Sequence, residues 1–223
     1  MGDQAISTPK KKILYVGLFI VPFLVAMALI FMGKGLGTLP IMGDDGTWLQ
    51  LKRKNPPIYY TIPEFELTDF EGKPLRFQHA DSVLYLLTVL PKSKPKEWSK
   101  HILYIGEKIV PRATNVRVIS LFEGSHKDNA WEEDPIPYIK TKSDKWSLAY
   151  VNQFQFNAFL EMFKTSINDS TGVVPYVLVD KDEHIRGLCD INDAKISRDI
   201  PKMFKLLSNQ YVSGKLDIKK VKK

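Results

Sequence analysis

The loop at residues 90–96 lies where an α/β protein usually carries its reactive group. An apolar run over residues 83–90 has the length of a buried strand, and a helical pattern follows the loop. The turn from a buried strand into a helix is a usual place for a ligand or a nucleophile. Here the turn consists of Pro91, Lys92, Ser93, Lys94, Pro95 and Lys96. None of these residues carries a thiol, an imidazole or a carboxylate, so the loop argues against thiol or metal chemistry at this position.

Other candidates for chemistry are few. Cys189 is the single cysteine, which excludes an internal disulfide and a CxxC motif. It lies in a strand-like stretch, and we interpret it as a small packed residue. Met162 is likewise assigned to the core rather than to a metal. His101 is expected on a helix surface, and no ligand spacing relates the four histidines, which are His79, His101, His126 and His184.

Acidic side chains occur in pairs, but none has the spacing of an acid–base pair across a pocket. We interpret these pairs as turns or solvated loops: Asp44-Asp45, Glu132-Glu133-Asp134 and Asp180/Asp182. The sequence also contains no glycine-rich phosphate loop and no G-x-S-x-G motif. General acid–base catalysis, nucleotide binding and serine hydrolysis are therefore not expected.

The positive charge of the chain is concentrated at its ends. The net charge is +7, with lysines at residues 10–12 and a lysine-rich tail at residues 212–223. No aromatic–basic motif accompanies these lysines, so nucleic-acid binding is not expected. Terminal lysine clusters are typical of solvated ends or of topology signals beside a membrane span.

An uncharged apolar segment at residues 13–32 predicts a single transmembrane helix. At 1.5 Å per residue this segment spans roughly 30 Å, the thickness of the hydrocarbon layer. The lysines before it favour a cytoplasmic N-terminus at residues 1–12, with the rest of the chain outside. A cleaved signal peptide is the alternative, but its apolar region would be shorter and would end in an A-x-A site. Residues 33–57 are rich in glycine and proline and are expected to form a linker.

Residues 58–211 show the alternation of strand and helix patterns that is typical of an α/β domain. Two short strands are expected around a turn at Glu71-Gly72, followed by a buried strand at residues 83–89. Trp98, Ile102, Ile105 and Ile109 define one face of a helix that ends before Pro111. A strand at residues 116–122 comes next.

The second half of the domain is expected to begin with an irregular insertion at residues 123–143. Leu148, Val151, Ala158 and Met162 then suggest one helical face. A hairpin is expected from strands at residues 176–180 and 184–190, and a last helix over residues 196–207 has a kink or a late start at Pro201. This order of elements is that of a thioredoxin-like domain with an N-terminal extension, in which a central mixed sheet is flanked by helices behind the single transmembrane helix.

Several stretches of the chain match the motifs of one known family. They are "TLPIMG", "YTIPEFELTDFEGKPLRF", "NVRVISLF", "KWSLA" and "YVLVDKDEHIRGLCD". Over residues 39–209 these stretches resemble the SCO/SenC family of membrane-anchored, thioredoxin-fold copper proteins. The first is similar to the family's entry into the domain, the second to its strand–turn–strand opening and the third to a central strand. The fourth resembles a later element in outline, and the fifth resembles the family's "FxLIDxxGxIRGxYD".

The ligand positions that this resemblance implies are not kept. The family's Cys-Pro-x-x-Cys-Pro motif falls on Leu90, Pro91, Lys92, Ser93, Lys94 and Pro95, so both prolines match and both cysteines are replaced. The family's ligand histidine falls on Gly172, or on Asp169 if an insertion is allowed. Cu(I) is held by thiolate, thioether or imidazole ligands, which these residues do not supply. Pro175 lies where the fold often places a cis-proline facing the reactive loop, and its isomer is left open.

The resemblance implies a membrane-anchored protein that acts outside the cytoplasm. We expect a non-catalytic binding or assembly protein without a cofactor in a bacterial inner membrane, with its domain in the periplasm and with a respiratory oxidase or its assembly factors as partner. The alternative is a copper chaperone or thiol–disulfide protein that uses other ligands such as Cys189. A permanent subunit of a membrane complex and a transient assembly factor both stay open.

Overall fold

The structure, a computed structural model, describes residues 38–50, 57–80, 83–93, 95–112, 115–125, 135–142, 144–165, 175–190 and 194–212. The predicted cytoplasmic N-terminus, the predicted transmembrane segment at residues 13–32 and the tail from residue 213 onward lie outside these ranges. Within the described residues, no helix combines the length and the apolar character needed to cross a membrane.

A mixed five-stranded sheet forms the centre of the domain, as predicted. Its strand order is β7 (Trp146–Val151), β6 (Val116–Glu123), β5 (Leu84–Leu90), β8 (Pro175–Val179) and β9 (Ile185–Asp190). Strands β5, β6 and β7 are parallel, whereas β8 and β9 pair in antiparallel fashion. Every residue of β5 is buried, which agrees with its continuous apolar sequence.

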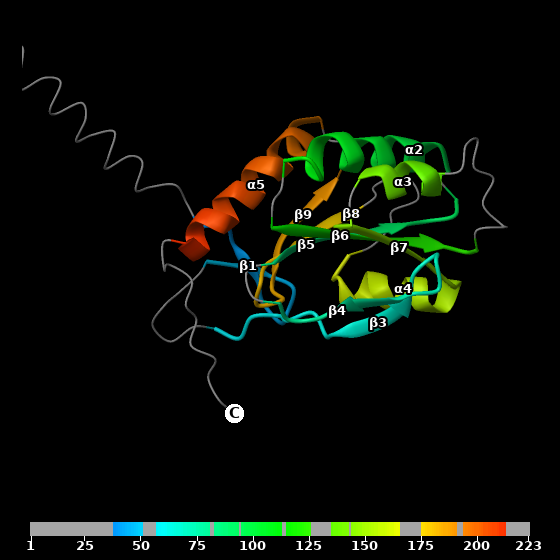
Figure 1. The fold of residues 1–223 in the computed structure, drawn as a ribbon. Helices are drawn as coiled ribbons and strands as arrows, with labels where there is room; N and C mark the ends of the chain where they lie inside the picture. Colours follow the sequence, from blue (N-terminus) through cyan, green and yellow to red (C-terminus); the bar gives the residue numbers. More distant parts are fainter. Residues whose placement is uncertain are drawn as a thin grey trace, which may run out of the picture. The chain divides into compact units, whose positions relative to one another are not determined.

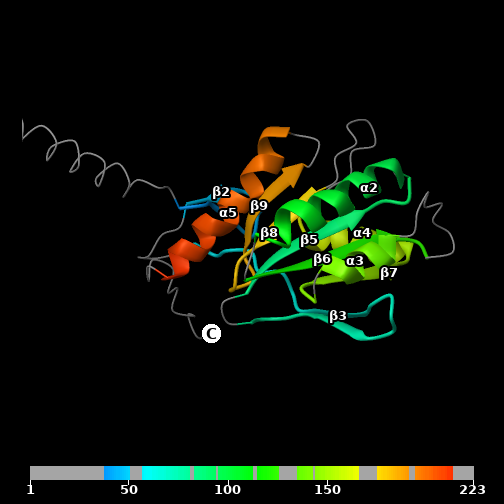
Figure 2. The same ribbon diagram turned by 45° about the horizontal axis from the view of Figure 1, so that its top comes forward.

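Helices and a hairpin cover the two faces of this sheet (Figure 1). Helices α2 (Pro95–Tyr104), α3 (Pro135–Lys142) and α5 (Ala194–Val212) lie on one face. Helix α4 (Gln153–Met162) lies on the other face together with the hairpin of β3 (Phe65–Thr68) and β4 (Pro74–Phe77). In the turned view of Figure 2, α2 and α5 stand in front of the sheet. Two apolar cores result, one on each side of the sheet.

The predicted helix face after the loop is confirmed. Trp98, Ile102, Ile105 and Ile109 are at most 5% exposed and pack against β5 and β6. The helix ends before Pro111, as expected, but its last turn is the π-helix η1 (Ile105–Ile109).

The predicted hairpins are confirmed as well. In the first, the Asp69 carboxylate accepts hydrogen bonds from the amides of Glu71 and Lys73, both at 2.8 Å. Gly72 completes this turn with φ +80°, a conformation that glycine adopts without a steric penalty. In the second, β8 and β9 pair around the turn at residues 181–183.

Two predictions in the middle of the chain are right only in part. Ala158 and Met162 lie in helix α4 as expected, but Leu148 and Val151 belong to β7, and the helix begins only at Gln153, after the capping box of Asn152 and Gln155. Part of the predicted irregular segment is helix α3, which begins at Pro135 and carries Pro137 in its first turn. Proline is tolerated there because first-turn amides have no intrahelical acceptor.

The last helix contains Pro201 within its span and begins at Ala194, so it does not start late. Part of the predicted linker is also ordered structure. Strands β1 (Ile41–Met42) and β2 (Trp48–Leu49) pair with each other, and Ile41 is completely buried. The compact unit that contains the five-stranded sheet begins at Thr38.

Candidate functional site

The loop after β5 begins where the family-like motif places its first cysteine. Leu90 occupies that position and is directed into the core. The Leu90 side chain is completely buried in the core with Trp98 and Phe122. Pro91 is also buried, whereas Lys92 and Ser93 are exposed. Lys94 lies outside the described residues, and Pro95 begins α2. The position that the family-like motif gives to its first cysteine is thus a core position.

A hollow of about 530 Å³ lies beside this loop, at the carboxyl ends of β5 and β6. The Lys92 amide donates a hydrogen bond to Glu123 Oε2 at 2.9 Å, which ties the loop to the end of β6. The first turn of α4 closes the other side and exposes Phe154 to 83%. We call this region the loop surface; the hollow is lined by Pro91, Lys92, Ser93, Glu123, Gln153, Phe156, Asn157 and Leu160.

The other predicted site positions are only partly described. Asp169 and Gly172 lie outside the described residues, as does Val174, so the Val174–Pro175 bond is not described either. Pro175 begins β8, where it pairs with Asp190 of β9. The structure therefore places Pro175 at a strand start, whereas both histidine-equivalent positions lie outside the described residues.

Cys189 is a packed residue, as expected. It lies on β9 opposite Tyr176 and is 4% exposed. Burial raises the pKa of its thiol to about 11. Because the thiolate is both the nucleophile and the metal ligand, this environment disfavours redox or copper chemistry at Cys189.

His101 was expected on the helix surface, and that prediction is wrong. Its side chain is completely buried, and its Nδ1 lies 2.7 Å from the Tyr176 hydroxyl. Burial, with a smaller effect of the Lys100 charge, lowers the pKa of His101 to about 3, so the ring is neutral. Its Nε2 has no hydrogen-bond partner within the described part of the chain.

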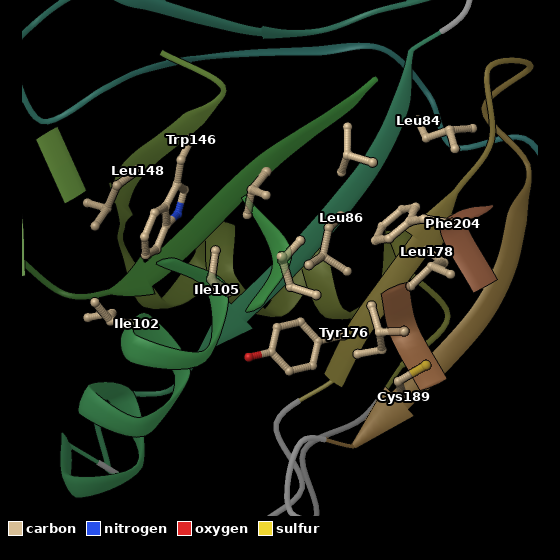
Figure 3. Close-up of a cluster of buried hydrophobic side chains, with 14 of the residues drawn as sticks. Leu84, Leu86, Ile102, Ile105, Trp146, Leu148, Tyr176, Leu178, Cys189 and Phe204 are labelled. Carbon is tan, nitrogen blue, oxygen red and sulfur yellow. The ribbon is translucent and has the colours of Figure 1, made fainter. Parts of the chain in front are cut away.

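His101 contacts, through Tyr176, a row of polar groups that crosses the sheet under α2. Ser120, Thr88, Tyr176 and Cys189 are successive partners in the strand registers of β6, β5, β8 and β9. Trp146 Nε1 donates to Ser120 Oγ at 3.1 Å, whereas Thr88 Oγ1 has no partner in the described ranges. Figure 3 shows Tyr176 within this core, with its hydroxyl directed to the side of Ile102.

A second buried polar cluster joins the β8–β9 turn to the N-terminal segment. Arg186 is completely buried and donates to Asp180 Oδ2 at 2.8 Å, to the Leu39 carbonyl at 2.6 Å and to the Pro40 carbonyl at 3.0 Å. Gln210 of α5 accepts a fourth bond at 3.3 Å. Burial alone would raise the pKa of Asp180, but His184 and Arg186 outweigh it and lower the pKa to about 2.

One group of side chains in the described ranges has the spacing of metal ligands. Single ligand atoms of Asp180, Asp182 and His184 lie within 4.8 Å of one another. However, Asp180 Oδ1 already accepts the amides of Asp182 and His184, and Asp180 Oδ2 holds the Arg186 guanidinium. A cation there would compete with a fixed positive charge. The carboxylate instead stabilises the turn, in agreement with the sequence-based interpretation.

Comparison with known proteins identifies the fold. No family model matches the sequence, and no curated protein matches it. Among solved structures, the chain is similar to BsSco, a member of the Sco family of cytochrome c oxidase assembly proteins, with 16% identity and a TM-score of 0.51 over 71% of this chain and 99% of that one. The chain has the thioredoxin-like fold of a Sco protein.

Two further solved structures have lower TM-scores than BsSco. A putative protein disulfide isomerase from Bacteroides thetaiotaomicron has 14% identity and a TM-score of 0.49 over 69% of this chain and 92% of that one. Arabidopsis thaliana ScoI with copper bound has 10% identity and a TM-score of 0.47 over 66% of this chain and 99% of that one.

Copper does not fit the residues of this Sco-like fold. Leu90 offers no donor atom and is completely buried, and the sequence supplies lysine and glycine or aspartate at the other ligand positions. A protonated lysine repels Cu(I), and a carboxylate is a poor soft ligand. Within the described residues, Asp180 and Arg186 are the matched "D" and "R" of the family-like stretch, and their role is structural.

Proposed function

We propose that this chain is a non-catalytic, Sco-like membrane protein that binds a protein partner through the loop surface. The observation that carries this proposal is the burial of Leu90, which puts a core side chain where a ligand or nucleophile would stand. The single thiol of the chain is buried, with its pKa raised to about 11. Binding is thus the activity best supported at the loop.

The setting of this function follows from the sequence pattern and the Sco-like fold. BsSco is described as a member of a family of cytochrome c oxidase assembly proteins, and we extend that role to this chain as part of the proposal. Residues 13–32 would anchor it in a bacterial inner membrane, with the domain facing the periplasm and a respiratory oxidase or its assembly factors as partner.

The loop surface has features that suit a docking role. Two prolines restrict the loop, so less conformational entropy is lost when a partner binds. Lys92 is exposed, and with Lys94 of the loop and Lys96 of the first turn of α2 it would favour an acidic partner through electrostatic steering. The exposed Phe154 adds an aromatic side chain at the first turn of α4.

A co-purification experiment tests the proposal. The full chain, tagged at its C-terminus, is isolated from native membranes, and stoichiometric oxidase subunits are expected with it. Changing Lys92, Lys94 and Lys96 to Glu is expected to reduce this capture severalfold. The control reverses three other exposed lysines, Lys100, Lys108 and Lys164, and makes the same change in net charge. Equal capture by both variants, or no oxidase at all, would reject the proposed role of the loop.

A metal titration separates the alternative function. We expect the purified full chain to bind no stoichiometric Cu(I) in competition with a chromogenic chelator. We also expect native Cys189 to react with a thiol reagent only after denaturation, because the thiol is buried and its pKa is raised. Tight binding of one Cu(I) that the Cys189→Ser change abolishes would instead identify a copper or thiol protein with displaced ligands.

A further inference from the structure

A hollow of about 400 Å³ between η1 and α5 combines an apolar floor with a cationic rim. The floor includes Ile109, Val116 and Phe204, which are buried in the core. Arg112 stands on the η1 side and Lys205 on the α5 side, and both are exposed. The cations of the rim therefore come from two separate elements and flank one apolar surface.

Among the described residues, none that lines this hollow carries a carboxylate. The remaining residues that line it are Asn115, Pro201, Lys202 and Ser208. Lys202 pairs with Asp199 at 2.6 Å, and Arg112 and Lys205 are the other two cations of the lining. The potential of the hollow is positive, so an anionic group is favoured at its rim.

The hollow is distinct from the loop surface. Val116 is the first residue of β6, whereas the loop surface adjoins Glu123 at the end of the same strand. The two regions consequently lie at opposite ends of the sheet. A ligand in this hollow does not depend on the proposed function of the loop.

We propose that this hollow binds a small organic carboxylate with an apolar body. An arginine guanidinium pairs with a carboxylate through two parallel hydrogen bonds, which suits Arg112 to the head group. The apolar body would pack against Ile109, Val116 and Phe204 at the floor of the hollow. The volume falls within the range of small-molecule sites, which are mostly apolar with a few polar groups that fix orientation. The chain's own lysine-rich ends carry the wrong charge for this rim.

Methyl NMR of the full chain in lipid nanodiscs tests the proposal, with 4-phenylbutyrate as the probe. We expect saturable shifts of the methyl groups of Ile109 and Val116. The methyl of Ile119 serves as the internal reference, because it lies in the core on the other face of the sheet. The uncharged analogue 4-phenylbutanol is expected to bind at least tenfold more weakly.

Matched variants test the role of the rim. The double change Arg112→Glu and Lys205→Glu is expected to raise the Kd for 4-phenylbutyrate at least tenfold, and Ser208→Tyr is expected to block the apolar body. Lys108→Glu and Lys100→Glu change the net charge outside the lining and are expected to leave the Kd unchanged. The absence of saturable shifts, equal binding of the alcohol, or an equal loss in the Lys108 and Lys100 control would overturn the proposal.

Discussion

Arg186 and His101 are both completely buried, yet the groups around them are partnered very differently. Arg186 donates to a carboxylate, two carbonyls and an amide oxygen, and each oxygen of Asp180 accepts at least one hydrogen bond. His101 makes one hydrogen bond, to Tyr176, and leaves Nε2 unpaired in the described structure. Thr88, beside Tyr176 in the register, has an unpaired hydroxyl in the same region of the described chain.

Buried polar side chains thus have two different effects on stability in this domain. The Arg186 cluster connects three segments that are distant in sequence, so its bonds hold the fold together. The His101 row lies under the helix that follows the altered loop, and its unpaired atoms lower stability. A fully satisfied network makes a structure unique, whereas a partly satisfied one destabilises it.

The largest expected effect is on the Arg186 cluster. Arg186→Met would leave the Asp180 carboxylate and the Leu39 and Pro40 carbonyls without their donor, and we expect a loss of about 3–5 kcal/mol in unfolding free energy. Chemical denaturation measures it. The control is Arg76→Met, which removes an exposed ion pair with Glu66 and should leave stability nearly unchanged. Similar effects of the two changes would contradict the structural role of Arg186.

The pH dependence of stability should distinguish the two clusters. In the folded protein the pKa of His101 is about 3, so the ring stays neutral above this pH. In the unfolded chain the ring takes up a proton near pH 6.5. The unfolded state thus binds more protons between these values, and stability falls as pH decreases from 6.5 towards 3. At pH 4.5 the His101 contribution would be a loss of about 2–3 kcal/mol.

The variant His101→Leu should lack this loss and show a flatter profile between pH 6.5 and 4.5. Asp180 affects stability at lower pH than His101, because its pKa is lowered from 3.8 to about 2. Its contribution is present above pH 3.8 and is lost as pH falls towards 2. Denaturation curves at several pH values measure both windows, and identical profiles for the variant and the wild type would contradict the burial of a neutral His101.

A smaller effect is expected at Tyr176. Tyr176→Phe removes the hydroxyl that pairs with His101 Nδ1 and leaves both ring nitrogens unpaired, which should destabilise the protein by about 1–2 kcal/mol. When Tyr176→Phe is combined with His101→Leu, the change in unfolding free energy should differ from the sum of the two single changes. Both changes break the same contact. Strict additivity in this double-mutant cycle would show that the pair does not interact.

The smallest effect is expected at Thr88 and has the opposite sign. Thr88→Val keeps the shape of the side chain and removes a buried hydroxyl that has no partner in the described ranges. We expect a gain of up to about 1 kcal/mol. Ser120→Ala is the contrasting change, because Ser120 accepts a bond from Trp146, and it should destabilise. A loss of stability in Thr88→Val would mean that the hydroxyl is paired.

Elements with a clear apolar pattern could be predicted from the sequence. The helix face of Trp98 and Ile102 follows from its apolar spacing, and the buried strand β5 follows from its continuous apolar run. Leu148 and Val151 were misassigned because β7 buries residues on both of its faces. Such a strand loses its period of two and then resembles one face of a helix. Helix α3 was missed because its prolines were taken as breakers, although they occupy a first turn.

The buried polar groups could be predicted less well. His101 follows Trp98 by three residues and so lies near the same helix face, but its polar character suggested solvent. Arg186 gave no local signal, because its acceptors lie up to 147 residues away in the chain. The loss of donors in the loop was clear from residue types alone, whereas the inward position of Leu90 required the packing of β5, Trp98 and Phe122.

The bonds from Arg186 to Leu39 and Pro40 also decide where tension enters the domain. A pull on the chain before residue 39 acts first on two carbonyls held by one guanidinium, and through it on β9 and on Gln210 of α5. The segment at Leu39 and Pro40 and helix α5 are therefore both bonded to the Arg186 side chain. We expect a force applied at Leu39 to load these hydrogen bonds before it separates strands of the central sheet.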